Sequence, residues 1–387
     1  MALHEFVMSH RDRYIEMADA FFDRPELGNC EFFASQTITD RLKELGFEVE
    51  LGIAGLQTAF KATLDHGTGG PNIGLLCEYD ALEGLGHACS HHLQAPSILL
   101  TVETILNHSP AAPYRLTVYG TPAEETTHGK LRMLEKGYMK ELDVALMMHG
   151  APDTTTDIKS LALTNLEVIY HGKSAHAALR PEEGRSALDA LLLAFQGTEF
   201  LREHVRDDVR MHYTILESPG PANVVPATAR AKFSLRSYSR DYLNTVEKRV
   251  ESVLRGAALM TETEVEIRWG DRLNNKIPNL TLNGLLMEKA KCVDAPRQTP
   301  PRQKTGSSDF SNVMYEVPGS CIRTAFVPTG TASHSQTFLD YGKSDEAHDA
   351  ISYAAEILTL SVVDLIEQPE LMAQIRAEFV ENKQKMA

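Results

Sequence analysis

Apolar residues recur along the first part of the chain with two different periods, which predicts alternating helices and strands. Helical spacing covers residues 4–22 and 34–45. Short apolar runs bounded by turn residues predict buried strands over 72–77, 115–119 and 143–148. Further helical segments are expected between these strands, near 93–107 and 129–137. Buried strands that alternate with helices indicate a mostly parallel sheet covered on both faces.

The middle of the chain shows a different order of elements. Its pattern predicts strand, helix, strand, strand, helix and strand over 161–170, 186–205, 211–217, 229–238, 242–260 and 264–269. This βαββαβ order is that of a ferredoxin-like domain. We therefore expect an α+β domain at residues 161–275, inserted into a first domain made of residues 1–160 and 276–387. The first domain is completed by a helix, a strand and a second helix, near 279–291, 319–327 and 344–365.

Composition and charge narrow the class of protein. The 387 residues are 43% hydrophobic, which is enough for the cores of two or three globular domains. The net charge of −15 argues against nucleic acid or an anionic membrane surface as a partner, because both bind clustered Lys and Arg. No signal-peptide pattern is present, and no apolar run approaches the roughly 20 residues of a membrane helix. Five scattered cysteines fit a cytoplasmic protein better than a disulfide framework.

Side chains capable of chemistry follow the predicted strands of the first domain. Glu78 and Asp80 follow the first strand, Glu124 and Glu125 follow the second, and His149 ends the third. In an open α/β sheet, ligands bind outside the carboxyl ends of the strands. We therefore expect these side chains to converge on one crevice.

A loop after the first of these strands crowds one thiol and three imidazoles into six residues. They are His87, Cys89, His91 and His92. A Cys-x-His pair can place two donors on one metal, although such a pair alone is more often an ordinary loop. Together with the carboxylates and His149 it predicts a site for Zn²⁺ or a neighbouring transition ion rather than Mg²⁺ or Ca²⁺. The supply of donors exceeds one tetrahedral site, so two ions about 3.5–4 Å apart are expected.

Seven segments in order along nearly the whole chain resemble the M20 metallopeptidase family. They are "PELGNCE" (25–31), "EYDALEGLGHACSHH" (78–92), "GTPAEE" (120–125), "MMHGAP" (147–152), "GKSAHAALRPEEGRSALDAL" (172–191), "NVVPATARAKFSLR" (223–236) and "GSSDFSNV" (306–313). The likeness is greatest to subfamily D, which contains aminobenzoyl-glutamate hydrolases, auxin-conjugate hydrolases, N-acyl amino acid deacylases and related dipeptidases. It implies a zinc-peptidase-like α/β fold, with a mixed sheet flanked by helices and an inserted ferredoxin-like lid that forms a homodimer.

The resemblance also implies roles for individual residues. The implied metal ligands are Cys89, His91, Glu125, His149 and His334, with the thiolate bridging two divalent ions, Zn or Mn (Co or Ni also suit). Glu124 matches the general base, and His176 matches a lid histidine that polarises the substrate carbonyl, often in the neighbouring subunit. Asn223 and Arg236 match lid residues that hold the substrate's carboxylate or the oxyanion. Asp80 is a further catalytic candidate, with orientation of a ligand or capping of a helix as the alternatives.

The chain departs from the family pattern at several positions. Glu83 replaces a proline, Ser186 replaces an asparagine of the lid, and Ser90 and His92 replace the Gly and Asp of "CGHD". Ser90 loses backbone freedom if its position requires a positive φ. His92 is either an alternative ligand or support for the metal shell, and Glu78 is either such a support or a plain loop residue. These changes bear on substrate specificity more than on the metal site.

We therefore expect metal-dependent hydrolysis of an amide, with Glu124 activating the attacking water. The expected substrates are N-acyl amino acids, aminobenzoyl-glutamate-like conjugates or dipeptides, and Arg236 favours one with a carboxylate. One alternative is a metal-dependent aminohydrolase of an aromatic amine, and another is a non-catalytic binding protein, which the presence of Glu124 disfavours. A cysteine hydrolase is disfavoured because Cys89 and His91, two residues apart, are poorly placed as nucleophile and base.

Overall fold

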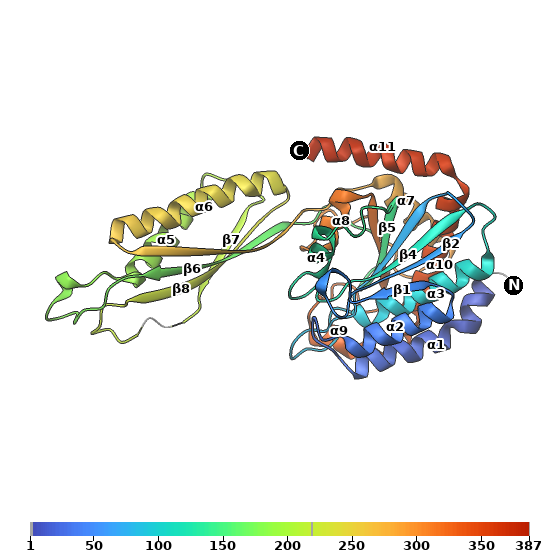
Figure 1. The fold of residues 1–387 in the computed structure, drawn as a ribbon, viewed down its shortest axis with the longest axis horizontal. Helices are drawn as coiled ribbons and strands as arrows, with labels where there is room; N and C mark the ends of the chain where they lie inside the picture. The colour runs from blue at the N-terminus through green and yellow to red at the C-terminus, as the bar shows by residue number, and fades with distance from the viewer. Residues whose placement is uncertain (1–2, 218–219, 387) are drawn as a thin grey trace. The chain divides into compact units, whose positions relative to one another are not determined.

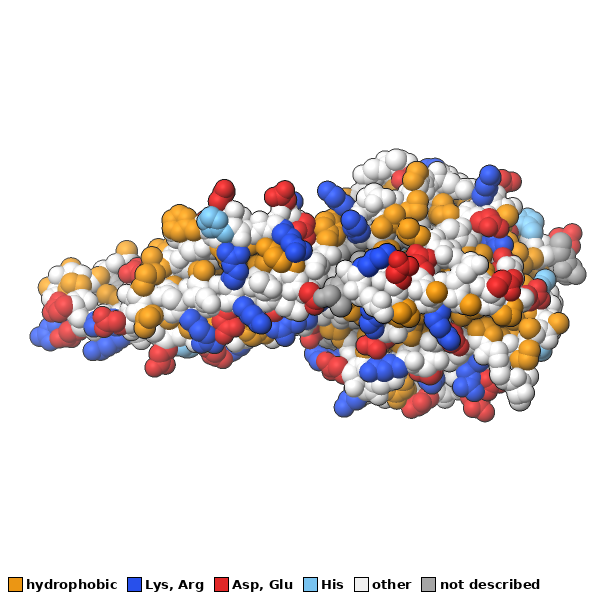
Figure 2. Space-filling view, turned by 90° about the horizontal axis from the view of Figure 1, so that it is seen from above, with side chains coloured by type: hydrophobic (Ala, Val, Ile, Leu, Met, Phe, Trp, Pro, Cys, Tyr) orange, Lys and Arg blue, Asp and Glu red, His pale blue; other side chains and the backbone are white. Residues whose placement is uncertain are grey.

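The computed structural model describes residues 3–217 and 220–386, which divide into two compact units (Figure 1). The first unit runs to Lys159 and resumes at Lys276–Lys385, and the second unit is Ser160–Asn275. Each unit has a hydrophobic core of its own. Within the described residues, no helix combines the length and the apolar character needed to cross a bilayer. On the face shown in Figure 2, acidic and basic side chains are interspersed, as on an ordinary solvated surface.

A six-stranded mixed sheet, in the order β1-β2-β4-β3-β5-β10, forms the centre of the first unit. The strands are β1 (Glu48–Leu51), β2 (Phe60–His66), β3 (Asn72–Cys77), β4 (Tyr114–Gly120), β5 (Val144–Ala151) and β10 (Gly319–Ala325). The pairs among β4, β3, β5 and β10 are parallel, whereas β1 and β2 add to the β4 edge in antiparallel fashion. Every residue of β3 is buried, as in an inner strand covered on both faces. The predicted α/β class is confirmed.

Helices cover both faces of this sheet. The helices of the first unit are α1 (Leu3–Asp23), α2 (Phe32–Glu44), α3 (Gln94–His108), α4 (Gly129–Glu135), α7 (Leu280–Cys292), α8 (Phe310–Glu316), α9 (Gln336–Asp340), α10 (Asp345–Glu367) and α11 (Pro369–Met386). Leu75 of β3 packs in one core with α3 and α10, while its neighbour Leu76 packs in a second core with α4 and α8. Because side chains alternate along a strand, each face of β3 therefore has its own helical layer.

The second unit is a four-stranded antiparallel sheet, in the order β7-β8-β6-β9, packed against two helices. Its elements are β6 (Ala162–His171), α5 (Ala187–Arg202), β7 (Arg210–Ile215), β8 (Thr228–Ser237), α6 (Arg240–Thr261) and β9 (Glu264–Leu273). Along β8, Ala229, Ala231, Phe233 and Leu235 are buried and the residues between them are more exposed. The alternation arises because one face of the sheet packs on α5 and α6 and the other does not (Figure 1). The βαββαβ order is the predicted one.

Candidate metal centre

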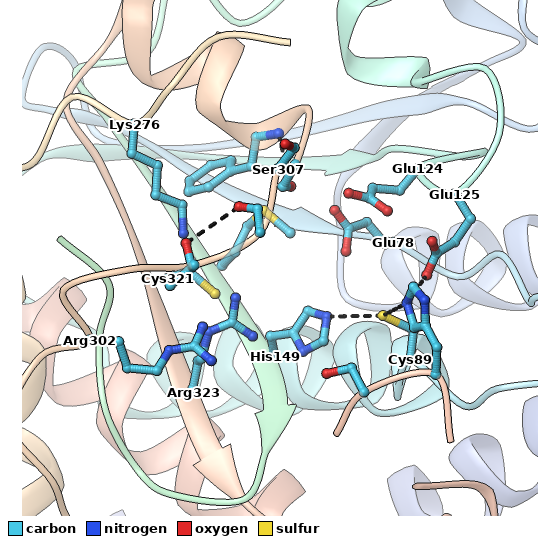
Figure 3. Close-up of a pocket in the computed structure, with 17 residues that line it drawn as sticks. Glu78, Cys89, Glu124, Glu125, His149, Lys276, Arg302, Ser307, Cys321 and Arg323 are labelled. Atoms are coloured by element: carbon cyan, nitrogen blue, oxygen red, sulfur yellow. Dashed lines mark hydrogen bonds and ion pairs between the residues drawn. The ribbon is translucent and has the colours of Figure 1, made fainter. Parts of the chain in front are cut away.

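The carboxyl ends of β3, β4 and β5 meet at a cavity of about 320 Å³ (Figure 3). Its wall contains Cys89, Glu124, Glu125, His149 and His334. Glu124 and Glu125 enter from the loop after β4, and His149 enters from β5 itself. Parallel neighbouring strands end at one edge of the sheet, so segments far apart in sequence meet there.

Five predicted ligands form two groups of donors that share one sulfur. The ligand atoms of Cys89, His91 and His149 lie within 4.8 Å of one another, and so do those of Cys89, Glu125 and His334. Cys89 Sγ is 3.6 Å from His149 Nε2 and 3.3 Å from His334 Nε2. Each of the two groups could hold a metal ion, and Cys89 belongs to both.

Hydrogen bonds behind two of the imidazoles fix which ring nitrogen faces the donor groups. His91 Nδ1 lies 3.0 Å from both the main-chain oxygen and Oδ1 of Asp80. His149 Nδ1 lies 2.7 Å from the carbonyl oxygen of Gly150. The Nε2 atoms thereby face the donor groups, the usual arrangement around a bound metal, and Glu78 Oε2 also lies 3.3 Å from His91 Nε2. Asp80 Oδ2 also accepts a hydrogen bond from the Glu125 amide at 3.0 Å, so Asp80 orients two of the donors.

The charges of this cluster favour the ionised forms of its acidic donors. Burial would raise the pKa of the Cys89 thiol, but the imidazoles of His91, His149 and His334 outweigh it and lower the pKa to about 7. Burial also opposes ionisation of Glu125, yet His334 and His91 lower its pKa to about 2. Glu125 Oε1 is buried without a hydrogen bond, although His334 Nε2 lies 3.1 Å away. Thiolate, carboxylate and imidazole are donors that suit zinc-like divalent ions. Interactions with Cys89 and Glu125 raise the pKa of His334 to about 10, so a metal ion bound there would displace a proton from this imidazole.

Three loops that carry donors each contain a residue with left-handed backbone. The φ angles are 62° at Ser90, 58° at Ala123 and 60° at His334. For residues with a Cβ this conformation costs about 1 kcal/mol or more. Ser90 therefore has the positive φ at which its replacement of glycine is costly, and glycine would be less strained at this position. Strain of this kind persists where the surrounding structure fixes the loops.

A buried cation lies beside the donors. Lys130 Nζ is 2.5 Å from Glu78 Oε1 and 2.7 Å from Asp309 Oδ1, and all three side chains are buried. Glu78 Oε2 is 3.3 Å from His91 Nε2, so Glu78 supports the donor set and is not a plain loop residue. Glu124 lies close to Glu78 and Asp309. Desolvation, then the charges of these two carboxylates, raises the pKa of Glu124 well above its ordinary value.

Comparison with known proteins places this arrangement in a family. Residues 72–359 match the model of peptidase family M20/M25/M40. The chain belongs to this family. M20 membership makes it a metal-dependent hydrolase that acts on C–N bonds, as predicted.

Relatives of this M20 chain match it over most of their length. Human Xaa-Arg dipeptidase is 31% identical, over 95% of this chain and 89% of that protein. One of the subunits of the p-aminobenzoyl-glutamate hydrolase of Escherichia coli K12 is 28% identical, over 97% of this chain and 94% of that subunit. A Bacillus subtilis structure described as a dinuclear metal-binding peptidase from the M20 family shares the fold, with a TM-score of 0.72. The match covers 93% of this chain and 99% of that chain, at 20% sequence identity.

Other residues predicted for the M20 site lie outside the two donor groups. His92 is buried and its Nε2 lies 2.8 Å from the Gly342 carbonyl oxygen, which gives it a supporting place in the loop. His176 and Asn223 are exposed on adjoining loops of the second unit, where the Ala177 amide donates to the Asn223 carbonyl at 3.1 Å. Arg236 is half-buried on β8 of the same unit.

The buried ion pairs of Lys130 with Glu78 and Asp309 were not predicted from the sequence, and substitution of Lys130 tests their contribution to stability. We expect Lys130→Met to lower the free energy of unfolding by about 3 to 5 kcal/mol, because it leaves two buried carboxylates without their cation. Urea denaturation followed by circular dichroism measures the change. Lys136→Met removes an exposed lysine just after the same helix and should change stability little. Equal effects of the two substitutions would contradict the structural role of Lys130.

Proposed function

We propose that the enzyme hydrolyses the amide bond of a small N-acyl amino acid, an aminobenzoyl-glutamate-like conjugate or a dipeptide. The observation that carries this proposal is the placement of Glu124 beside two donor groups that share Cys89. Ligand atoms of His91, Glu124 and Glu125 also lie within 4.8 Å of one another. The activities of the relatives, on dipeptides and on p-aminobenzoyl-glutamate, support the same substrate class.

Two divalent ions, zinc or manganese, would be held by the two donor groups. Cys89 with His91 and His149 would hold one ion, and Cys89 with Glu125 and His334 would hold the other. When bound, such ions act as Lewis acids and make water a good nucleophile near neutral pH. Asp80 acts as a positioning residue in this scheme, because it contacts His91 and Glu125 and acts through them.

Glu124 performs the proton transfers. Its carboxylate accepts a proton from the water that attacks the substrate carbonyl and returns it to the leaving amine nitrogen. Desolvation and the charges of Glu78 and Asp309 raise the pKa of Glu124, which makes its carboxylate a stronger base.

The second unit is proposed to supply substrate-binding groups, as the family resemblance implies. His176 would polarise the carbonyl and stabilise the developing oxyanion. Asn223 and Arg236 would hold the substrate's carboxylate, a task that suits the planar guanidinium. Two copies of the chain are proposed to associate through this unit.

A substrate panel tests the proposed function. Metal-free enzyme, with Zn²⁺, Mn²⁺ or Co²⁺ added back, is incubated with N-acyl amino acids, aminobenzoyl-glutamate and dipeptides, and the released amine is measured. We expect turnover of at least one of these classes with metal and its loss with EDTA. An amide activity that survives complete metal removal, or a metal-loaded enzyme that hydrolyses none of the panel, would refute the proposal.

A further inference from the structure

The cavity contains a group of basic side chains that the proposed reaction does not use. Lys276, Arg302 and Arg323 line it together with the metal donors. In Figure 3, Arg302 and Arg323 lie on the opposite side of His149 from Cys89. All three belong to the first unit. We call these three side chains the basic cluster.

The three side chains of the basic cluster all contact one buried carboxylate. Asp157 is buried and pairs with all three members: Oδ2 is 2.5 Å from Lys276 Nζ and 3.1 Å from Arg323 Nη2, and Oδ1 is 2.7 Å from Arg302 Nη2. Three cations therefore surround the single carboxylate of Asp157. A buried acid such as Asp157 needs one good partner to compensate its charge, so stability alone does not account for three cations on a cavity wall.

The register of the sheet places the basic cluster next to the donors. Arg323 on β10 is the direct Cα partner of His149 on the parallel strand β5. Side chains at matched positions of neighbouring parallel strands point to the same face, and the strands are about 4.8 Å apart. Arg323 therefore lies one strand away from a proposed metal ligand, on the same side of the sheet.

The cluster is accessible from the cavity and has polar surroundings. The Arg302 side chain keeps 37% of its surface exposed, and that of Arg323 keeps 16%. Ser307 and Ser308, on the loop that follows Arg302, line the same cavity and add hydroxyl groups. Guanidinium groups with neighbouring hydroxyls form a binding site for a carboxylate or a similar oxyanion.

We propose that the basic cluster binds an anionic group on the acyl side of the substrate. This inference rests on the proposed function, which assigns the carboxylate of the amine-side amino acid to Arg236 and Asn223. The acyl group then takes the remaining part of the cavity, on the basic side of His149. The substrate class is an amide whose acyl group ends in a carboxylate, such as a succinyl amide or a dipeptide with an acidic first residue.

A matched pair of substrates tests this assignment. N-succinyl and N-butyryl derivatives of one amino acid have acyl chains of equal length and differ in the terminal carboxylate. We expect kcat/KM to be about tenfold or more higher for the succinyl compound, chiefly through KM. Arg302→Gln should remove most of this preference, and Arg302→Lys should restore part of it. Lys304→Gln removes an exposed charge from the same loop outside the cavity wall and should leave the preference unchanged.

Binding measured without turnover separates this inference from the proposed function. The metal-loaded Glu124→Gln enzyme is titrated calorimetrically with both compounds, with and without the Arg302→Gln substitution. Tighter binding of the succinyl compound that depends on Arg302 supports the anionic subsite even where no amide is hydrolysed. Equal affinity and equal kcat/KM for the two compounds overturn it while leaving amide hydrolysis in place.

Discussion

Replacement of Glu124 by glutamine is expected to lower kcat by about 1000-fold while leaving the metal content of the enzyme unchanged. Glutamine keeps the size and the hydrogen-bonding shape of the side chain but cannot accept the proton of the attacking water. Metal content should persist because Cys89, His91, Glu125, His149 and His334 supply two donor groups without this residue. Initial rates on the best substrate of the panel, together with metal analysis of the purified variant, measure both quantities.

Glu16→Gln provides the matched control for this experiment. Glu16 is an exposed glutamate of α1 in the first unit, and the same chemical change there should alter neither kcat nor metal content. A Glu124→Gln enzyme with more than a tenth of the wild-type rate would remove Glu124 from the role of base. Loss of metal from that variant would instead assign Glu124 to the ligands.

Cys89→Ser is expected to cost the enzyme most of its bound metal and more than 99% of its activity, about a 100-fold effect or larger. The sulfur belongs to both donor groups, so its loss weakens the sites of both ions together. A serine hydroxyl is a poor replacement because it stays protonated near neutral pH, whereas interactions with the neighbouring imidazoles lower the pKa of the Cys89 thiol to about 7. Metal analysis by atomic emission after gel filtration gives the number of ions per chain.

Cys292→Ser is the control, since Cys292 is an exposed free cysteine of the first unit. Wild-type enzyme and this control should bind the same number of ions. If Cys89→Ser lost only one ion, the sulfur would serve one donor group and not bridge two. If it kept both ions and full activity, Cys89 would have no place among the ligands.

Elements with a continuous buried face could be predicted from the sequence. The run 72–77 coincides with β3, whose residues are all buried, and the periodic segment 344–365 coincides with most of α10. The convergence of Glu124, Glu125 and His149 could also be predicted, because it follows from the parallel strand order. In each case the physical signal is local: a strand buried on both faces or a helix buried along most of its length must be largely apolar.

Helices and strands that bury few side chains were not predicted from the sequence. The strand β1 has four residues, none of them fully buried, and α11 is rich in charged residues. Such segments are held by their neighbours in the fold and have weak hydrophobic periodicity of their own. The antiparallel addition of β1 and β2 to the sheet was likewise not predicted.

Ion pairs between residues far apart in the sequence could not be predicted either. Nothing near Lys130 in the sequence points to Glu78 or Asp309, because these ion pairs exist only once three separate segments have packed together. Arg323 did give a local signal, since it is the one charged residue in the otherwise uncharged strand Gly319–Ala325. A charge inside a buried strand requires a partner or a ligand, and this one has Asp157 and the cavity.

The pairing of β5 with β10 across an inserted unit has a consequence for biosynthesis. The ribosome releases β5 long before β10, and the whole of Ser160–Asn275 emerges between them. That contiguous segment can complete its own sheet early, while one edge of β5 stays unpaired until β10 has been synthesised. Open strand edges promote aggregation. A nascent chain that stalls before Gly319 therefore exposes an edge that favours aggregation.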